Sequence, residues 1–351
     1  MWLLLREKPF WLVVWVFVGA QKTPGDDGEQ GVIGDDVAIL VIGSIGLDTV
    51  ETPAGAVKDA LGGSASYFAV AASYFDQVNL VAVVGDDFPP PLVETFRRRQ
   101  IDLAGFRTEP GATFRWGGRY HLDLNSRDTL FTELGVFADF APVIPDAYRS
   151  SEILFLANIV PQLQLGVLRD LGDALRLRAL DTMNHWIASA RDDLTAAIRQ
   201  MDMVIIAEEE ARQFAETTSL RAAVRHILGL GPRTLVVKQG SYGALLFTAD
   251  GAFFAAPAYP LEDVRDPTGA GDCFAGGFLG YLSQRLRVVG DVAALTSADY
   301  RRALVYGNIM GSFACEDFSV NRLLTLTPEE IAARYQEFVN FTHFEGDWRG
   351  A

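Results

Sequence analysis

The chain has 351 residues, of which 49% are hydrophobic, so it can bury a large core in one large α/β domain or in two smaller ones. Its formal net charge is −15, and no basic run exceeds the three arginines at 97–99, which argues against nucleic acid or an anionic membrane as the main partner. Two cysteines and four scattered histidines provide neither a disulfide framework nor the ligand spacing of a zinc site, so a reducing compartment fits best.

The first 20 residues begin with two basic residues and continue into an apolar run at 10–18. This pattern is similar to a short signal peptide, and the run is too short to span a bilayer as a helix. The alternative is a start extended beyond the fold, or a loosely attached tail. A polar, glycine-rich stretch at 21–36 follows, so we expect residues 1–36 to form an N-terminal tail outside the folded domain.

From residue 37 on, short apolar segments alternate with helical ones. Strands are predicted at 37–42, 79–84, 153–156, 179–181, 203–206, 234–237 and 244–247. Helices are predicted at 64–75, 91–100, 163–177, 208–216 and 220–228, with two more near the C-terminus. Because such apolar strands are buried on both faces, the pattern implies a largely parallel sheet that is covered by helices on each side.

The segment at 113–122, TFRWGGRYHL, breaks this pattern with an alternation of period two. One face carries Phe114, Trp116 and Tyr120, and the other carries Thr113, Arg115, Arg119 and His121. A strand this polar does not suit the middle of a parallel sheet. We therefore expect a small separate sheet, to which residues 46–58 contribute the remaining strands.

The stretch at 266–282, DPTGAGDCFAGGFLGYL, places two glycines and an acid at the start of a helix. Gly269, Ala270 and Gly271 can bring bare backbone N–H groups close to an anion, and the positive end of the helix dipole strengthens such a pocket. The same dipole stabilises Asp272 as a carboxylate that can accept a proton. An anion cradle beside a base is what phosphoryl transfer to an alcohol requires, although an acidic residue on a tight glycine turn is an equally good structural explanation.

The first part of this stretch, DPTGAGDCFAGGF, resembles the C-terminal signature of the ribokinase-like (pfkB-type) carbohydrate kinase family, and the resemblance extends over about residues 37–321. It implies a Rossmann-like α/β/α sandwich at 37–340 with a small β-sheet lid near 46–58 and 107–124. It also implies an ATP-dependent kinase that transfers the γ-phosphate to a hydroxyl of a sugar, nucleoside or related polyol. Asp272 is then the catalytic base, and the anion hole consists of Gly269, Ala270 and Gly271.

By the same resemblance, Asp48 in GSIGLD holds the acceptor, since one carboxylate can accept hydrogen bonds from two neighbouring hydroxyls. Without the resemblance, an aspartate in a turn is the better explanation of this residue. Gly62 and Gly63, in LGGSASYF, open a helix where the backbone approaches the acceptor. Tyr67 stands where the family usually has an asparagine, so the acceptor contacts differ there. Arg115 grips a carboxylate or phosphate of the acceptor if its face of the strand points inward, and is a solvated charge if it points outward.

The segment MVIIAEEEARQF resembles the family's Asn-x-x-Glu motif. Glu210 matches the acid, which helps to organise magnesium through water, and Ala207 stands in place of the asparagine. An alanine side chain cannot hydrogen-bond a phosphate or a metal-bound water, so the rate of a kinase would suffer. Asp181 and Asn184, in LDTMNHWI, border the nucleotide or the acceptor, or form a local cap.

Two further segments supply candidates for the nucleotide site. VKQGSYG brings Lys238, Gly240 and Gly243 beside the nucleotide, although a plain β-turn explains the same residues. Thr268, just before the glycine motif, and Asn308, on a helix with small residues, are the other candidates. Ordinary helix packing is the alternative explanation for the segment around Asn308.

The resemblance implies ATP and Mg²⁺ as cofactors, with a monovalent cation as a further candidate, and a small-molecule acceptor rather than nucleic acid or a membrane as partner. A homodimer formed through the small sheet is a candidate assembly. Because the reaction needs cytosolic ATP, we expect a cytoplasmic protein and interpret residues 1–36 as a tail. The identity of the acceptor stays open.

Two other classes of function are alternatives to a kinase. Ala207 suggests, as one alternative, a relative that binds a nucleotide or a sugar without catalysis. A pure binding protein, however, has no need of Asp272. Gly43 and Gly46 follow the first strand as in a dinucleotide-dependent oxidoreductase, yet the full G-x-G-x-x-G motif is absent there. The kinase is therefore the leading interpretation.

Overall fold

The computed structural model describes residues 38–172 and 175–343. The predicted tail at 1–36 lies outside these described residues. Within the described ranges, no helix is both long enough and apolar enough to cross a membrane.

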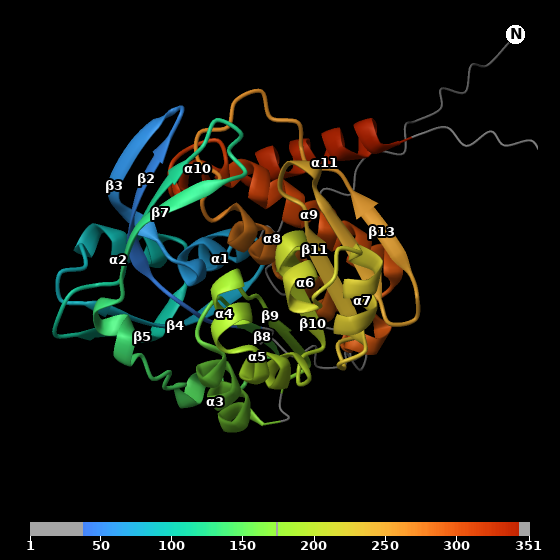
Figure 1. Ribbon diagram of the computed structural model, residues 1–351, viewed down its shortest axis with the longest axis horizontal. Helices are drawn as coiled ribbons and strands as arrows, with labels where there is room; N and C mark the ends of the chain where they lie inside the picture. Colours follow the sequence, from blue (N-terminus) through green and yellow to red (C-terminus); the bar gives the residue numbers. More distant parts are fainter. Residues whose placement is uncertain (1–37, 173–174, 344–351) are drawn as a thin grey trace, which may run out of the picture. The chain divides into compact units, whose positions relative to one another are not determined.

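A large sheet with the strand order β13-β12-β11-β10-β9-β8-β1-β4-β5 forms the centre of the described chain (Figure 1). Its strands are β1 (Ala38–Ile42), β4 (Gln77–Gly85), β5 (Asp102–Glu109), β8 (Ile153–Leu156), β9 (Leu177–Leu180), β10 (Met203–Ala207), β11 (Thr234–Lys238), β12 (Ala244–Thr248) and β13 (Phe253–Ala256). Neighbouring strands from β5 to β11 are parallel, whereas β12 pairs antiparallel with both β11 and β13. The parallel strands are the continuous apolar runs of the sequence.

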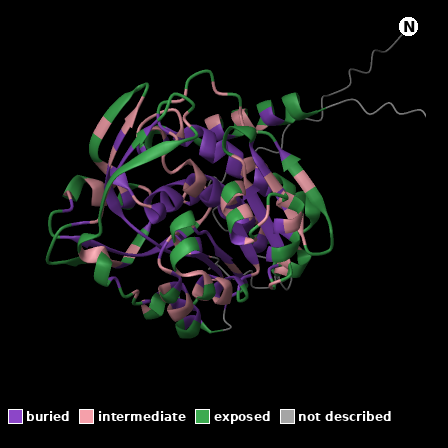
Figure 2. Ribbon diagram, in the orientation of Figure 1, coloured by how far each residue is buried: buried purple, intermediate pink, exposed green. Residues whose placement is uncertain are grey.

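Helices cover both faces of this sheet, as the buried interior in Figure 2 shows, and the predicted α/β/α sandwich is confirmed. In β1, Ile39 and Val41 belong to the apolar core on one face, and Leu40 and Ile42 belong to the core on the other. The first core includes residues of α1 (Ser64–Ala72), α2 (Pro90–Arg98), α8 (Ala270–Val289), α9 (Ser297–Ala314), α10 (Asn321–Thr325) and α11 (Pro328–Thr342). The second includes residues of α3 (Pro161–Leu171), α4 (Asn184–Ser189), α5 (Arg191–Ile198), α6 (Glu208–Phe214) and α7 (Leu220–Leu228).

A second, four-stranded sheet stands beside the sandwich, as predicted, in the order β3-β2-β6-β7; we call it the small sheet. Its strands are β2 (Gly46–Thr52), β3 (Gly55–Gly62), β6 (Arg115–Tyr120) and β7 (Arg127–Glu133). Strands β2 and β6 are parallel, and the two outer pairs are antiparallel. The residues of β7 are all exposed, which agrees with an edge strand that packs on no core.

The structure differs from the sequence prediction at several elements. The predicted helix at 163–177 is α3, which ends at Leu171 because Gly172 turns the chain with φ of +61°, and Leu177 already belongs to β9. Strands β5, β7 and β13 and helices α4 and α5 were not predicted. Residues 107–109 lie in β5 of the large sheet, so the small sheet takes its outer strand from farther along the chain, in β7. Short or exposed elements such as these carry little hydrophobic periodicity.

Candidate active site

Three charged side chains meet at the carboxyl ends of adjacent parallel strands. Asp181 follows β9, Glu210 lies in the first turn of α6 directly after β10, and Lys238 ends β11. Lys238 Nζ donates a hydrogen bond of 2.5 Å to Asp181 Oδ2. These residues are far apart in sequence, and the order of the strands brings them together. This edge of an open parallel sheet is where ligands usually bind.

The glycine turn at the start of α8 lies against this cluster. Gly269 adopts a left-handed conformation with φ of +75°, and a Cβ there would fall 2.3 Å from the ring of Tyr67. Thr268 N–H donates to Asp266 Oδ1 at 2.9 Å, which fixes the chain just before the turn. Lys238 Nζ is 3.2 Å from the position that a Cβ on Gly271 would occupy. The bare backbone therefore allows both Tyr67 and Lys238 to approach the turn closely.

Asp272 lies in the first turn of α8, next to the cluster. Burial, and next the charge of Asp181, raise the pKa of Asp272 to about 8, against the lowering effect of the Lys238 ammonium. Asp48 and Glu210 also raise the pKa of Asp272, so a carboxylate of the small sheet and one of α6 both lie near it. A carboxylate with such a pKa is a stronger base than an exposed aspartate.

Asp48 comes from β2 of the small sheet and is 4% exposed. Burial, and next the charge of Asp266, raise the pKa of Asp48 to about 7, and a hydrogen bond from the Gly63 backbone lowers it. A Cβ on Gly62 would fall 2.0 Å from Asp48 Cγ, so a glycine is required where β3 passes the carboxylate. The predicted acceptor residues on β2 and at the start of α1 are thus adjacent.

Tyr67 lies on α1 directly beneath the glycine turn and is 2% exposed. Its hydroxyl is buried and has no hydrogen-bond partner among the described residues. Burial raises the pKa of Tyr67, and so do Asp48 and Asp266, so the hydroxyl stays protonated and can donate. Such a buried donor near two carboxylates is a polar group that water or a ligand can satisfy.

Glu210 accepts a hydrogen bond of 2.9 Å from the Ala207 backbone N–H and thereby caps α6. Burial, and next Asp181, raise the pKa of Glu210 to about 7, whereas Lys238 lowers it. Glu208 is engaged with Arg212 and Gln239, so it does not join the cluster. The methyl group of Ala207 adds no polar contact, as the sequence indicated.

The predicted nucleotide residues fall into two groups. Gly240 and Gly243 flank the turn between β11 and β12, next to Lys238. The amide of Asn308 on α9 donates to the Pro257 carbonyl at 3.1 Å, so its side chain holds the segment after β13 against the helix. A Cβ on Gly243 would lie 2.5 Å from the carbonyl carbon of Pro257, so the segment that Asn308 holds packs against this turn.

The small sheet reaches over the site at two points. Thr268 Oγ1 and Tyr120 Oη are 3.2 Å apart, which links β6 to the residue before the glycine turn. Asn125, in the turn between β6 and β7, has its Oδ1 3.3 Å from the position of a Cβ on Gly240. The small sheet thus spans from the acceptor residues to the turn after β11.

Arg115 and Arg119 have carboxylate partners instead of open space in front of them. Arg115 pairs with Asp59 of β3 and, at 2.8 Å, with Asp87 of the loop after β4. Arg119 pairs with Glu51 at 2.6 Å and is 58% exposed. Arg127, at the start of β7, was missed by the sequence analysis because the stretch at 121–133 shows no alternation. Its charge lowers the pKa of Glu210, against the larger opposing effect of burial.

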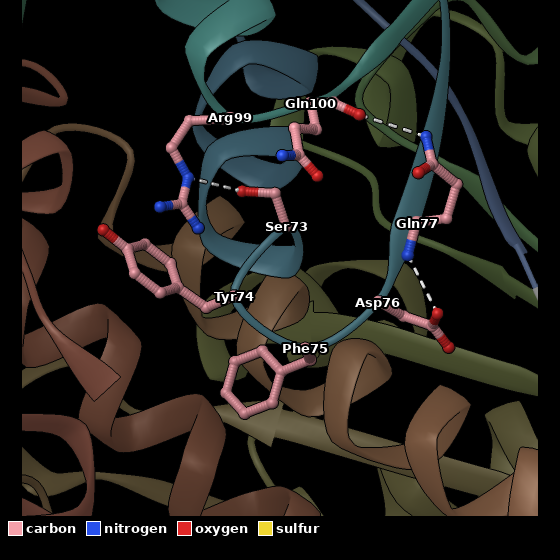
Figure 3. A pocket seen from close by; sticks show the side chains of 7 residues that line it. All are labelled: Ser73, Tyr74, Phe75, Asp76, Gln77, Arg99 and Gln100. Carbon is pink, nitrogen blue, oxygen red and sulfur yellow. Dashed lines mark hydrogen bonds between the residues drawn. The ribbon is translucent and has the colours of Figure 1, made fainter. Parts of the chain in front are cut away.

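A separate cavity of about 180 Å³ lies at the other edge of the large sheet (Figure 3). It is lined by residues at the C-terminal ends of α1 and α2 and at the start of β4. Arg99 Nε donates to Ser73 Oγ at 3.0 Å, and its guanidinium lies 3.6 Å from the centroid of the Tyr74 ring. The start of a parallel strand is opposite to its carboxyl end, so this cavity is not part of the candidate site.

An α/β/α sandwich, with a small separate sheet placed over the carboxyl edge of its parallel strands, defines a ribokinase-like fold. Residues 38–325 match the family described as pfkB family carbohydrate kinase, so the chain belongs to that family. Both the fold and the family predicted from the glycine motif are therefore confirmed.

Individual relatives act on different acceptors. The chain is 32% identical over 251 residues to the cytidine kinase of Thermococcus kodakarensis, covering 70% of this chain and 88% of that protein. It is 30% identical over 241 residues to the 2-dehydro-3-deoxygluconokinase of Thermoproteus tenax, covering 63% of this chain and 73% of that protein. A putative ribokinase II from E. coli, solved in complex with ATP and Mg²⁺, shares its fold with a TM-score of 0.69 at 18% identity, over 86% of this chain and 99% of that one. Relatives thus include nucleoside and sugar kinases.

Proposed function

We propose that the protein is an ATP-dependent kinase that transfers the γ-phosphate to a hydroxyl of a nucleoside, sugar or related polyol. The observation that supports it most is the position of Asp272, a buried base in the first turn of α8 directly beside the bare backbone of Gly269–Gly271. The N–H groups of this turn and the helix dipole suit the transferred phosphoryl group. A non-catalytic binding protein would not need this base.

In the proposed mechanism, Asp48 holds hydroxyls of the acceptor and orients one of them toward Asp272. Asp272 takes the proton of that hydroxyl while the hydroxyl oxygen of the acceptor forms a bond to the γ-phosphorus. The bond from the γ-phosphorus to the bridging oxygen breaks, and its electron pair leaves with ADP. The small sheet closes over the reactants as a lid and excludes water, which would otherwise hydrolyse ATP.

The carboxylates at the site fit a magnesium ion. Asp181 and Glu210 both raise the pKa of Asp272, so a cation in their vicinity would relieve their mutual repulsion. Within the described residues, no three carboxylate, histidine or cysteine side chains are arranged as a ready metal cage. This agrees with Mg²⁺, which is held by one or two carboxylates, by phosphates and by water. When bound, the ion supplies positive charge beside the phosphates.

We also propose a cytoplasmic protein and a homodimer that forms through the small sheet. Strand β7 is the outer strand of that sheet, and its Leu130 and Phe131 are 43% and 36% exposed. A monovalent cation as an additional cofactor is a further proposal of this function. The molar mass in solution and the effect of K⁺ on turnover check these two points directly.

The test of the function is an ADP-release assay with ATP and Mg²⁺ across a panel of nucleosides, sugars, polyols and phosphosugars. We expect acceptor-dependent ADP release that falls by about 10²- to 10⁴-fold in Asp272→Asn, because a general base is removed. Binding of ADP, measured by calorimetry, serves as the control and should be retained. Unchanged turnover in Asp272→Asn would remove the proposed base, and silence across the panel with intact nucleotide binding would favour the non-catalytic alternative and Ala207 as its cause.

A further inference from the structure

One face of the small sheet is directed at the candidate site. Asp48 on β2 and Trp116 on β6 are paired residues of two parallel strands, so their side chains leave the sheet on the same face. Tyr120 follows Trp116 at an even spacing and belongs to this face too, and its hydroxyl is 3.2 Å from Thr268 Oγ1 at the glycine turn. The face that carries Asp48, Trp116 and Tyr120 thus covers the space in which an acceptor is proposed to bind, and we call it the site face.

The two arginines of β6 belong to the opposite face, because they alternate with Trp116 along the strand. Arg115 is held by Asp87 at 2.8 Å, and Arg119 is held by Glu51 at 2.6 Å. Their charges are therefore balanced within the protein, on the side of the small sheet that is turned away from the acceptor. Of the two alternatives for Arg115, this register favours the one in which its side chain does not bind the acceptor.

The space beside Asp48 carries negative charge. Burial, and next the charge of Asp266, raise the pKa of Asp48, and both carboxylates are buried. Within the described residues, no cationic side chain contributes to this pKa. A carboxylate or phosphate on the acceptor would therefore place a further negative charge beside two buried carboxylates, which is unfavourable. An uncharged acceptor avoids this repulsion.

Trp116 presents its ring on the site face. A Cβ on Gly118 would fall 2.2 Å from a carbon of the Trp116 ring, so the indole lies across the bare backbone of that glycine. Gly117 makes the same room on the opposite face, where a Cβ would fall 2.4 Å from the ring of Phe131. The sequence Trp-Gly-Gly thus builds one aromatic surface on each face of the small sheet, and that of Trp116 is the one beside Asp48.

The other two aromatic residues of the site offer no open surface. Tyr67 and Tyr120 are buried, and the ring of Tyr67 lies against Gly269. Trp116 is only half-buried. Among these three rings, a flat group of an acceptor can therefore stack on Trp116 alone.

Arg127 also lies at the site face, but it leaves the indole open to a ligand. Its guanidinium carbon is 5.7 Å from the centroid of the Trp116 ring, well beyond the distance of about 3.5–4 Å at which carbon atoms are in contact. The charge of Arg127 lowers the pKa of Glu210 on α6 and is not among the causes that shift the pKa of Asp48. Arg127 therefore does not balance an anionic acceptor at Asp48.

Resting on the proposed kinase function, we propose that the acceptor is an uncharged nucleoside, whose ribose hydroxyls bind Asp48 and whose base stacks on Trp116. A nucleoside matches both features of the site face, because its ribose is a polyol and its base has a flat π surface. The negative charge around Asp48 selects against sugar acids and phosphosugars. Stacking does not read the hydrogen-bonding edge of a base, so Trp116 by itself accepts purine and pyrimidine nucleosides.

The test measures by calorimetry, without ATP, the affinities for adenosine, cytidine, ribose, ribose 5-phosphate and gluconate. We expect the parent protein to bind the nucleosides about 10- to 100-fold more tightly than ribose, and to bind ribose 5-phosphate and gluconate more weakly than ribose. Trp116→Leu should remove the advantage of the nucleosides and leave the affinity for ribose unchanged, whereas Trp116→Phe should keep most of that advantage. Phe131→Leu, on the opposite face, is the control and should change no affinity.

Equal affinities for ribose and the nucleosides, an equal loss of both in Trp116→Leu, or tighter binding of gluconate or ribose 5-phosphate would overturn the proposal. If Trp116→Leu fails to fold, the comparison in the parent protein and in Trp116→Phe decides. The binding measurement needs no turnover, so its failure is distinguishable from that of the kinase function. A parent protein that binds nucleosides but releases no ADP retains this site without being a kinase, and one that phosphorylates only sugar acids or phosphosugars is a kinase for which this acceptor is wrong.

Discussion

Helix α8 has a left-handed glycine at each end, and the two differ only in their surroundings. Gly269 precedes the helix with φ of +75°, and Gly290 follows it with φ of +76°. A Cβ on Gly269 would fall 2.3 Å from the ring of Tyr67, whereas a Cβ on Gly290 has nothing within 4 Å. Replacing each by alanine therefore separates the cost of the backbone conformation from the cost of the collision.

An alanine at position 290 would have to adopt the left-handed conformation but would collide with no atom. Gly290→Ala should therefore lower the free energy of unfolding by about 1–2 kcal/mol. Gly269→Ala meets the same conformational cost and also forces its methyl group against Tyr67, which is 2% exposed and cannot move into solvent. Overpacking of this kind adds about 1–3 kcal/mol, which gives a total of about 2–5 kcal/mol for Gly269→Ala.

Urea unfolding of both variants measures this difference. The collision is then isolated by making Gly269→Ala in a Tyr67→Ala background, where the cost should fall to that of Gly290→Ala. Equal losses for the two single variants, or an undiminished loss without the Tyr67 ring, would refute the packing described for the glycine turn. In the ADP-release assay only Gly269→Ala should lower turnover, because only this turn borders Asp272.

Two further predictions concern charge. Burial, and next Asp181, raise the pKa of Asp272 to about 8, so the base is protonated below that pH. The value of kcat/KM should therefore rise with pH and level off above about pH 8. A flat profile between pH 6 and 8 would exclude this base. Lys238→Met removes the ammonium from Asp181 and should lower the free energy of unfolding by about 3 kcal/mol at pH 8. The loss should shrink at pH 5, where the carboxylates with raised pKa values are protonated, and an equal loss at both pH values in urea unfolding would contradict it.

The part of the site that could be predicted from the sequence is the part that is local in the chain. Gly269 to Asp272 are consecutive, and the apolar residues that follow them indicate a helix, so the anion cradle and the base are recognisable without coordinates. The same holds for the apolar runs of the central strands, because burial on both faces leaves a continuous pattern. The role of Asp272 in catalysis still stays a prediction.

The tertiary structure decided which distant residues meet. Asp181 and Lys238 are neighbours because β9, β10 and β11 are adjacent in the sheet, an order that hydrophobic periodicity does not contain. Periodicity indicated that Arg115 and Arg119 share a face, but only the fold shows that each has a carboxylate partner. Arg127 lies on an exposed edge strand without any apolar pattern, and only the tertiary structure brings its charge close enough to lower the pKa of Glu210. The sequence by itself therefore determines groups of consecutive residues, such as the glycine turn with its aspartate. The contacts between distant segments depend on strand order and on how the two sheets face each other.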